Sequence, residues 1–180
     1  MNPFPLPLII RQATLQNLPC LLIGGHAVNH YSAPRLTLDV DLMIRKSDGK
    51  AWSDLVIAEG FRLLHDGGNF LQFSPPYGTN WRLDFMLVGE ATFEKLHGQS
   101  TRVTAMGAEL NLPSPAHLIA LKLHALAHGP VARRDKDLPD IVNIINEQKL
   151  QLDENPLAEI FERYGTPELI CEVSQRLKTP

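Results

Sequence analysis

Apolar and polar positions along the first part of the chain predict short strands interspersed with helices. Apolar runs and period-two alternation predict strands at about 20–23, 37–45, 61–64, 70–73 and 81–88, and an extended pair at 101–111. Helical spacing and helix-end signals predict helices at about 8–17, 24–31, 48–59, 114–128, 138–148, 155–163 and 167–177. The pattern therefore predicts an α+β fold in which helices flank a mixed β-sheet.

The character of the chain changes at Pro113, which we interpret as a boundary. Ser114 is a good helix N-cap, and Pro115 suits the first helical position because an N–H there would have no helical partner. Every element predicted beyond this point is a helix. We therefore expect a core at residues 1–112 and a helical C-terminal part at 113–180 that packs on it.

Composition indicates an ordinary globular protein of 180 residues, with 44% hydrophobic and 21% charged residues. The net charge of −3 argues against a strongly basic surface that coats nucleic acid. Cys20 and Cys171 have no metal-binding spacing, and the N-terminus has no secretory pattern. No segment approaches the ~20 apolar residues of a membrane span. We therefore expect a cytoplasmic protein with reduced thiols and no membrane partner.

Three aspartates occur in a pattern that favours a metal site. Asp39 and Asp41 are separated by one residue, so on a strand they share a face while Val40 points into the core. Asp84 alternates in the same way on a later strand. Because neighbouring carboxylates repel each other, a hard divalent cation such as Mg²⁺ would relieve the repulsion. The pattern favours phosphoryl-transfer chemistry.

Gly24 and Gly25 follow a short apolar run upstream of these aspartates and predict a turn. With this Gly-Gly turn, the chain resembles the nucleotidyltransferase superfamily that includes DNA polymerase β. Its order is a strand, a Gly-Gly turn, a helix, a strand with Asp-x-Asp and a later strand with a third Asp. Within the superfamily the chain is similar to AbiEii toxin-type and minimal nucleotidyltransferases, and to aminoglycoside nucleotidyltransferases. The helical part after residue 113 is similar to the AbiEii-type proteins. The matching segments are Ile23-Gly24-Gly25, Asp39-Val40-Asp41-Leu42 and Leu83-Asp84-Phe85.

The resemblance implies a nucleotidyltransferase fold and roles for the matching residues. Asp39 and Asp41 are expected to bind one or two Mg²⁺ ions, and Asp84 to bind the second ion or act as general base. The backbone N–H groups of Gly24 and Gly25 are expected to receive phosphate oxygens of an NTP. Many members have Ser or Thr next to the second glycine. Here His26 stands there, either as a phosphate donor or as a structural residue.

Three more residues are nucleotide-binding candidates. Arg35 is expected to orient an aspartate or a phosphate. Lys122 lies within an apolar helix, where it either extends its amine to solvent or contacts the triphosphate. Asp137 resembles a family site position, although it and Asp140 also suit the start of the next helix.

Other polar residues have simpler explanations. The His pairs at 26 and 30 and at 124 and 128 lack the glutamate of a zinc-protease helix, so we expect no zinc site. The basic residues at 133, 134 and 136 are interpreted as a solvated loop that is also able to face phosphates. Tyr77 and Trp81 are expected to pack in the core rather than stack on a base.

We therefore predict an enzyme that transfers an NMP from an NTP to an acceptor hydroxyl and releases pyrophosphate. RNA or tRNA, a protein and a small molecule remain open as acceptors. The AbiEii resemblance implies a toxin with an antitoxin partner, whereas the aminoglycoside resemblance implies an antibiotic acceptor. The alternative from another class is a non-catalytic regulatory module that binds a nucleotide.

Overall fold

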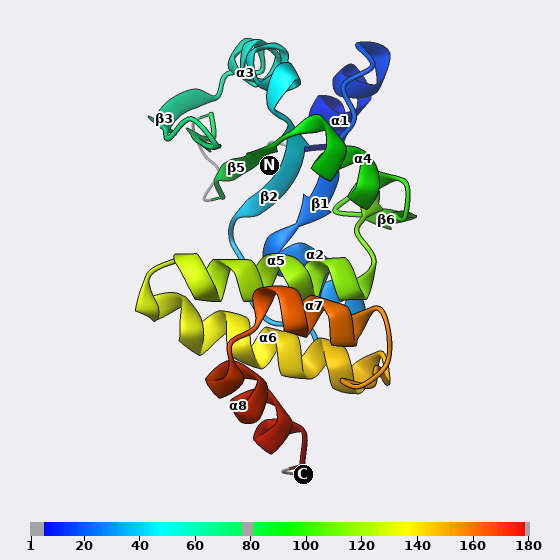
Figure 1. Cartoon of the computed structure of the whole chain (residues 1–180). Coiled ribbons are helices and arrows are strands. Elements are labelled where there is room, and N and C mark those ends of the chain that lie inside the picture. Colours follow the sequence, from blue (N-terminus) through cyan, green and yellow to red (C-terminus); the bar gives the residue numbers. More distant parts are fainter. Residues whose placement is uncertain (1–5, 77–80, 179–180) are drawn as a thin grey trace. The chain divides into compact units, whose positions relative to one another are not determined.

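Seven strands form one mixed sheet in the computed structural model, which describes residues 6–76 and 81–178 (Figure 1). Neighbouring strands follow the order β3-β4-β5-β2-β1-β7-β6. The β2–β5 and β1–β7 pairs are parallel, and the other neighbouring pairs are antiparallel. The strands are β1 (Leu21–Ile23), β2 (Val40–Arg45), β3 (Arg62–Asp66), β4 (Phe70–Ser74), β5 (Leu83–Val88), β6 (Thr101–Ala105) and β7 (Ala108–Leu112). The mixed sheet confirms the predicted α+β class.

The chain divides into two units. The first comprises Met1–Ala27 and Leu36–Pro113, and the second comprises Val28–Arg35 and Ser114–Pro180. The first contains the whole sheet, together with α1 (Leu6–Leu15), the start of α2 (Gly24–Tyr31), the short η1 (Lys46–Asp48), α3 (Gly49–Ala58) and α4 (Glu90–His97). The second contains α5 (Pro115–His128), the short η2 (Val131–Arg133), α6 (Arg134–Glu147), α7 (Leu157–Tyr164) and α8 (Pro167–Lys178).

One part of the core of the first unit lies on the face of β2 and β5 that carries Val40 and Leu83. Val40 and Leu83 are fully buried and face each other in the parallel register. Phe85 lies between Trp52 of α3 and Phe73 of β4, with ring centroids 5.3 and 5.7 Å away. Because strand side chains alternate, burial of these apolar residues directs the intervening acidic residues to the opposite face.

The second unit is a set of packed helices. The α5 helix contacts α6 and α7, and α6 contacts α8. The apolar side chains of these helices form its core, among them Ile119, Leu123, Ile141, Phe161 and Val173. No helix among the described residues combines the length and apolar character needed to cross a membrane.

Three elements differ from the prediction. The strand expected at 37–45 begins only at Val40. The Val40 N–H donates to the carbonyl of Arg82, the residue before β5, at 2.8 Å. The helix expected at 138 begins at Arg134, because Asp135 and Asp137 in its first turn favour a helix N-terminus. The α4 helix was not predicted; its N-cap is Gly89, which offers no side-chain signal.

The start of α5 gives a test of local stability. Ser114 is the N-cap and accepts a hydrogen bond from the His117 N–H at 3.3 Å, with Pro115 at the first helical position. We predict that Ser114→Ala lowers the free energy of unfolding by about 1 kcal/mol, because that N–H loses its partner. Urea denaturation measures the change. Ser114→Asp should retain most of the stability, and an equal loss in both variants would contradict the capping role.

Candidate active site

The parallel pairing of β2 and β5 brings acidic side chains together in the first unit. Asp41 of β2 and Asp84 of β5 are direct neighbours in the parallel register. Asp39 precedes Val40, and Arg82 precedes Leu83. The hydrogen bond from the Val40 N–H to the Arg82 carbonyl fixes these two strand starts beside each other.

The carboxyl group of Asp84 is buried and incompletely hydrogen-bonded. Asp84 is only 7% exposed. Its Oδ2 accepts a hydrogen bond from Gln72 Nε2 at 3.2 Å, whereas its buried Oδ1 has no hydrogen-bond partner. Burial raises the pKa of Asp84 to about 6; Gln72 lowers the pKa, while the charges of Asp41 and Asp39 raise it further. The carboxyl group is therefore placed to accept a proton or a cation.

Gly24 is required by both its backbone and its surroundings. Its φ of +64° lies in the left-handed region that glycine tolerates best. A Cβ at this position would lie 1.9 Å from Asp41 Oδ2, so any side chain would collide with the carboxylate. A Cβ at Gly25 would likewise lie 2.5 Å from Thr37 Oγ1. The Gly-Gly turn therefore lets β1 and α2 approach the acidic strand.

Asp39 is held by an arginine. Arg82 Nε donates to Asp39 Oδ1 and Arg82 Nη2 donates to Asp39 Oδ2, both at 3.1 Å. Asp39, Asp41 and Asp84 all raise the pKa of the Arg82 guanidinium, with the hydrogen bond to Asp39 as the largest cause. The site thus combines three carboxylates with one guanidinium, in or directly before two neighbouring strands.

These residues fit a hard divalent cation. Their donor set consists of carboxylate oxygens, which Mg²⁺ prefers, and one of those oxygens is buried without a partner. Within residues 6–76 and 81–178, no three His, Cys, Asp or Glu side chains are already grouped to hold a metal ion. The pairing of Asp39 with Arg82 keeps one of the three carboxylates occupied.

A second charged cluster is buried in the second unit. Lys122 Nζ donates to Asp137 Oδ1 and Asp140 Oδ2, both at 2.7 Å. Arg35 donates to both oxygens of Asp140, at 2.8 and 2.7 Å. Burial raises the pKa of Asp140, but Arg35 and Lys122 outweigh that effect and the pKa lies below its usual value. Asp137 Oδ2 is buried without a hydrogen-bond partner, 3.7 Å from Arg133 Nη1.

This cluster decides between several sequence interpretations. Lys122 is 6% exposed and ion-paired, so it does not extend its amine to solvent. Asp137 lies in the first turn of α6, at the start of the helix as expected, but neither it nor Asp140 is the N-cap, which is Arg133. Arg35 pairs with an aspartate, Asp140, which agrees with one of the two interpretations of this residue.

The predicted residues thus fall into two groups, one in each unit. Asp39, Asp41, Asp84 and the glycines lie in the first unit, with His26 as the third residue of α2. Arg35, Lys122 and Asp137 lie in the second. Trp81 packs on Phe61 with ring centroids 5.4 Å apart, as expected of a core residue, and Tyr77 lies outside the described residues.

Four polar residues of these groups were not identified as functional from the sequence. They are Arg82, Gln72, Thr37 and Asp140. The alternation in β5 already puts Arg82 on the face of Asp84, so that signal was available. Gln72 is recognised only through the register, in which it pairs with Asp84.

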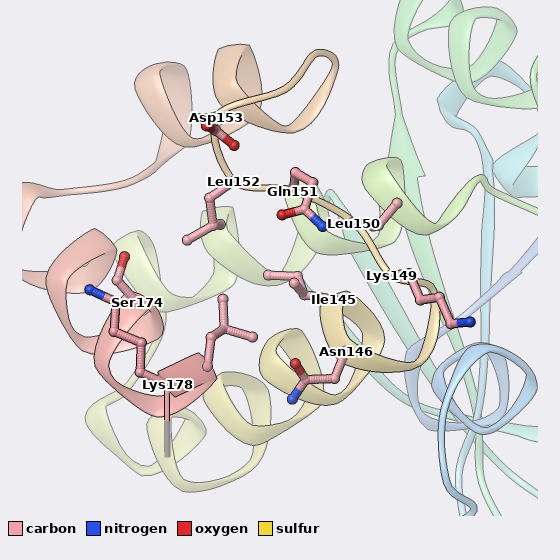
Figure 2. A pocket seen from close by; sticks show the side chains of 10 residues that line it. Ile145, Asn146, Lys149, Leu150, Gln151, Leu152, Asp153, Ser174 and Lys178 are labelled. Carbon is pink, nitrogen blue, oxygen red and sulfur yellow. The ribbon is translucent and has the colours of Figure 1, made fainter. Parts of the chain in front are cut away.

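The second unit also contains a cavity of about 830 Å³ at the ends of α6 and α8 (Figure 2). Apolar side chains such as Ile145 and Leu177 line it together with Lys149, Asp153 and Lys178. None of the residues predicted from the sequence lines this cavity.

No protein-family model matches the chain, and no curated protein matches it at a significant level. Solved structures do. The crystal structure of ANT(2")-Ia in complex with adenylyl-2"-tobramycin is 16% identical, with a TM-score of 0.64, over 87% of this chain and 94% of that one.

Two further solved structures are similar to the chain in overall fold. The lincosamide antibiotic adenylyltransferase LnuA, bound to lincomycin, is 12% identical with a TM-score of 0.55, over 81% of this chain and 96% of that one. An antigenic nucleotidyltransferase-like protein from Paracoccidioides brasiliensis is 17% identical with a TM-score of 0.53, over 93% and 89%. At these identities the similarity shows the fold, and the chain has the nucleotidyltransferase fold.

Proposed function

We propose that the protein is a Mg²⁺-dependent nucleotidyltransferase that transfers an NMP from an NTP to an acceptor hydroxyl. The observation that carries this proposal is the placement of Asp41 beside the buried Asp84, against the Gly24 turn. On a nucleotidyltransferase fold, this is the chemistry that neighbouring carboxylates and a phosphate-accepting turn serve together.

Asp39 and Asp41 would hold Mg²⁺, with Asp84 as an additional ligand or as the general base. The bound cation would neutralise charge on the triphosphate. The acceptor hydroxyl gives its proton to Asp84, and its oxygen forms a bond to the α-phosphorus. The bond from that phosphorus to the oxygen bridging to the β-phosphate breaks, and pyrophosphate leaves with the electron pair. A pKa near 6 leaves Asp84 mostly ionised at neutral pH yet basic enough to take the proton.

The remaining candidates are assigned to nucleotide binding. The N–H groups of Gly24 and Gly25, at the start of α2, are suited to phosphate oxygens, and His26 follows them. Lys122, Arg35 and Asp137 supply two cations and a carboxylate whose Oδ2 accepts no hydrogen bond. Burial of this many charges is a weak source of stability, which supports a role in ligand binding.

An antibiotic is the acceptor that one specific observation favours. Two of the similar structures are of antibiotic-modifying proteins, one with adenylylated tobramycin and one with lincomycin. The net charge of −3 suits a cationic acceptor better than tRNA, whose binding requires several cation–phosphate contacts. A toxin acting on RNA or protein, with an antitoxin partner, is the competing proposal.

Turnover is predicted to depend on Asp41. The test incubates the protein with Mg²⁺ and each of four α-³²P-labelled NTPs, and with total RNA, the protein itself or aminoglycosides as acceptor. We expect Asp41→Asn to lower label transfer at least ~100-fold, because a metal ligand is lost. Asp54→Asn, at an exposed residue of α3 paired with Lys50, should transfer at the wild-type rate.

The outcomes of this experiment separate the classes of function. Label on one acceptor identifies the nucleotide and the acceptor together. Nucleotide binding by the wild type without transfer to any acceptor would support the regulatory module instead. If the wild type neither bound nor transferred a nucleotide, the assignment of the site would be overturned.

The ionisation of Asp84 is predicted to destabilise the metal-free protein. Because the folded-state pKa is raised above the usual 3.8 to about 6, the folded state binds the proton more tightly. Stability is therefore lost as pH rises from about 4 through 6. Asp84→Asn removes this loss. At pH 7 the free energy of unfolding of the variant should therefore be about 2–3 kcal/mol higher than that of wild type, and at pH 4 the two values should be nearly equal.

Urea denaturation in EDTA between pH 4 and 7.5 measures this difference. Asp54→Asn is the matched control and should follow the wild-type curve throughout. A difference between wild type and Asp84→Asn that does not change with pH would contradict the raised pKa.

A further inference from the structure

The guanidinium of Arg82 occupies both oxygens of Asp39. The two hydrogen bonds, each 3.1 Å, form a bidentate pair across the starts of β2 and β5. The side chain of Arg82 is 50% exposed and that of Asp39 is 33% exposed, so a ligand in solvent reaches both. The pair is therefore exchangeable, unlike the buried ion pairs of Lys122.

Backbone contacts hold the two partners in place. The Arg82 carbonyl accepts from the Val40 N–H at 2.8 Å, which aligns residues 39 and 82 at the end of the parallel register. Arg82 is also two residues before Asp84, and it interacts electrostatically with Asp84 and Asp41. The guanidinium thus neutralises part of the charge that would attract a divalent cation.

This arrangement has a consequence for metal binding. A divalent cation on Asp39 competes with Arg82 for the same two carboxylate oxygens, and the two cations repel each other. A triphosphate, however, offers Arg82 an alternative bidentate partner, since a guanidinium binds phosphate oxygens in the same fork geometry as a carboxylate.

We propose that Arg82 is an exchangeable counter-ion of Asp39 that couples metal binding to NTP binding. Without nucleotide, Arg82 holds Asp39 and weakens the affinity for a divalent cation. When an NTP arrives, its phosphates take the guanidinium, and Asp39 becomes free to bind the metal. The coupling is reciprocal, so metal also strengthens nucleotide binding. Arg82 is then a positioning residue for the reaction, and this inference rests on the proposed function.

The test measures binding rather than turnover. Binding of Mn²⁺ is followed by electron paramagnetic resonance, with and without an α,β-methylene NTP analogue that cannot react. Binding of the same analogue is followed by calorimetry in EDTA. The variants are Arg82→Gln, which removes the charge but keeps an amide donor, and Arg82→Lys, which keeps the charge but loses the bidentate geometry.

We expect Arg82→Gln to bind Mn²⁺ alone about five-fold more tightly than wild type, the range set by exposed ion pairs. It should bind the metal-free analogue about five-fold more weakly, and the gain in Mn²⁺ affinity on adding analogue should be smaller than in wild type. The affinities of Arg82→Lys for Mn²⁺ and for the analogue should lie between those of wild type and Arg82→Gln. Arg102→Gln, which breaks an exposed pair with Glu109 on the β6–β7 hairpin, should behave as wild type.

A purely structural role predicts the opposite sign. If Arg82 only aligned Asp39, its removal would weaken Mn²⁺ binding, and that result, or an unchanged affinity, would overturn the proposal alone. Asp41→Asn identifies the signal, because it should lose Mn²⁺ binding. If wild type bound no Mn²⁺ even with the analogue present, the proposed function itself would be overturned, and this inference with it.

Discussion

The parallel register of β2 and β5 is the constraint on which the candidate site depends. It places Asp41 beside Asp84 and aligns Asp39 with Arg82 two residues earlier. The same register buries Val40 and Leu83 on the other face, so packing and chemistry are fixed together. A slip by one residue would move every side chain of a strand to the opposite face, which would put carboxylates into the apolar core. Burial of the core therefore enforces the proximity of like charges.

The short-range features of the fold could be predicted from the sequence, and the long-range ones could not. Period-two alternation located β5, and the Gly-Gly turn located the start of α2, because both signals lie within a few residues. The late start of β2 depends on the Arg82 carbonyl, 42 positions along the chain from Val40. Asp137, in the first turn of α6, is paired with Lys122, which lies on another helix. Charged residues suggest a solvated connector unless their partners are known, and no local pattern reveals those partners.

The two charged groups illustrate different electrostatic solutions. In the second unit, Lys122 and Arg35 satisfy Asp140 from two sides and lower its pKa, so that group resists a change of protonation. In the first unit, burial dominates at Asp84 and raises its pKa to about 6, which is closer to neutral pH than the usual value. A carboxylate that is fully paired is stable and unreactive, whereas one that is buried and underpaired is reactive. Only the second kind suits the proposed general base, which would gain and lose a proton in each cycle.

Gly24 links these considerations at a single position. A left-handed backbone alone penalises an ordinary residue by about 1–2 kcal/mol, which a folded protein can absorb. The overlap of a new Cβ with the Asp41 carboxylate is a separate effect, relieved only by moving that side chain. Substitutions here can therefore leave a folded protein whose acidic site is misaligned. A survey of variants by cellular abundance would rate such a protein as acceptable, and only a survey by activity would reveal why the chain has glycine there.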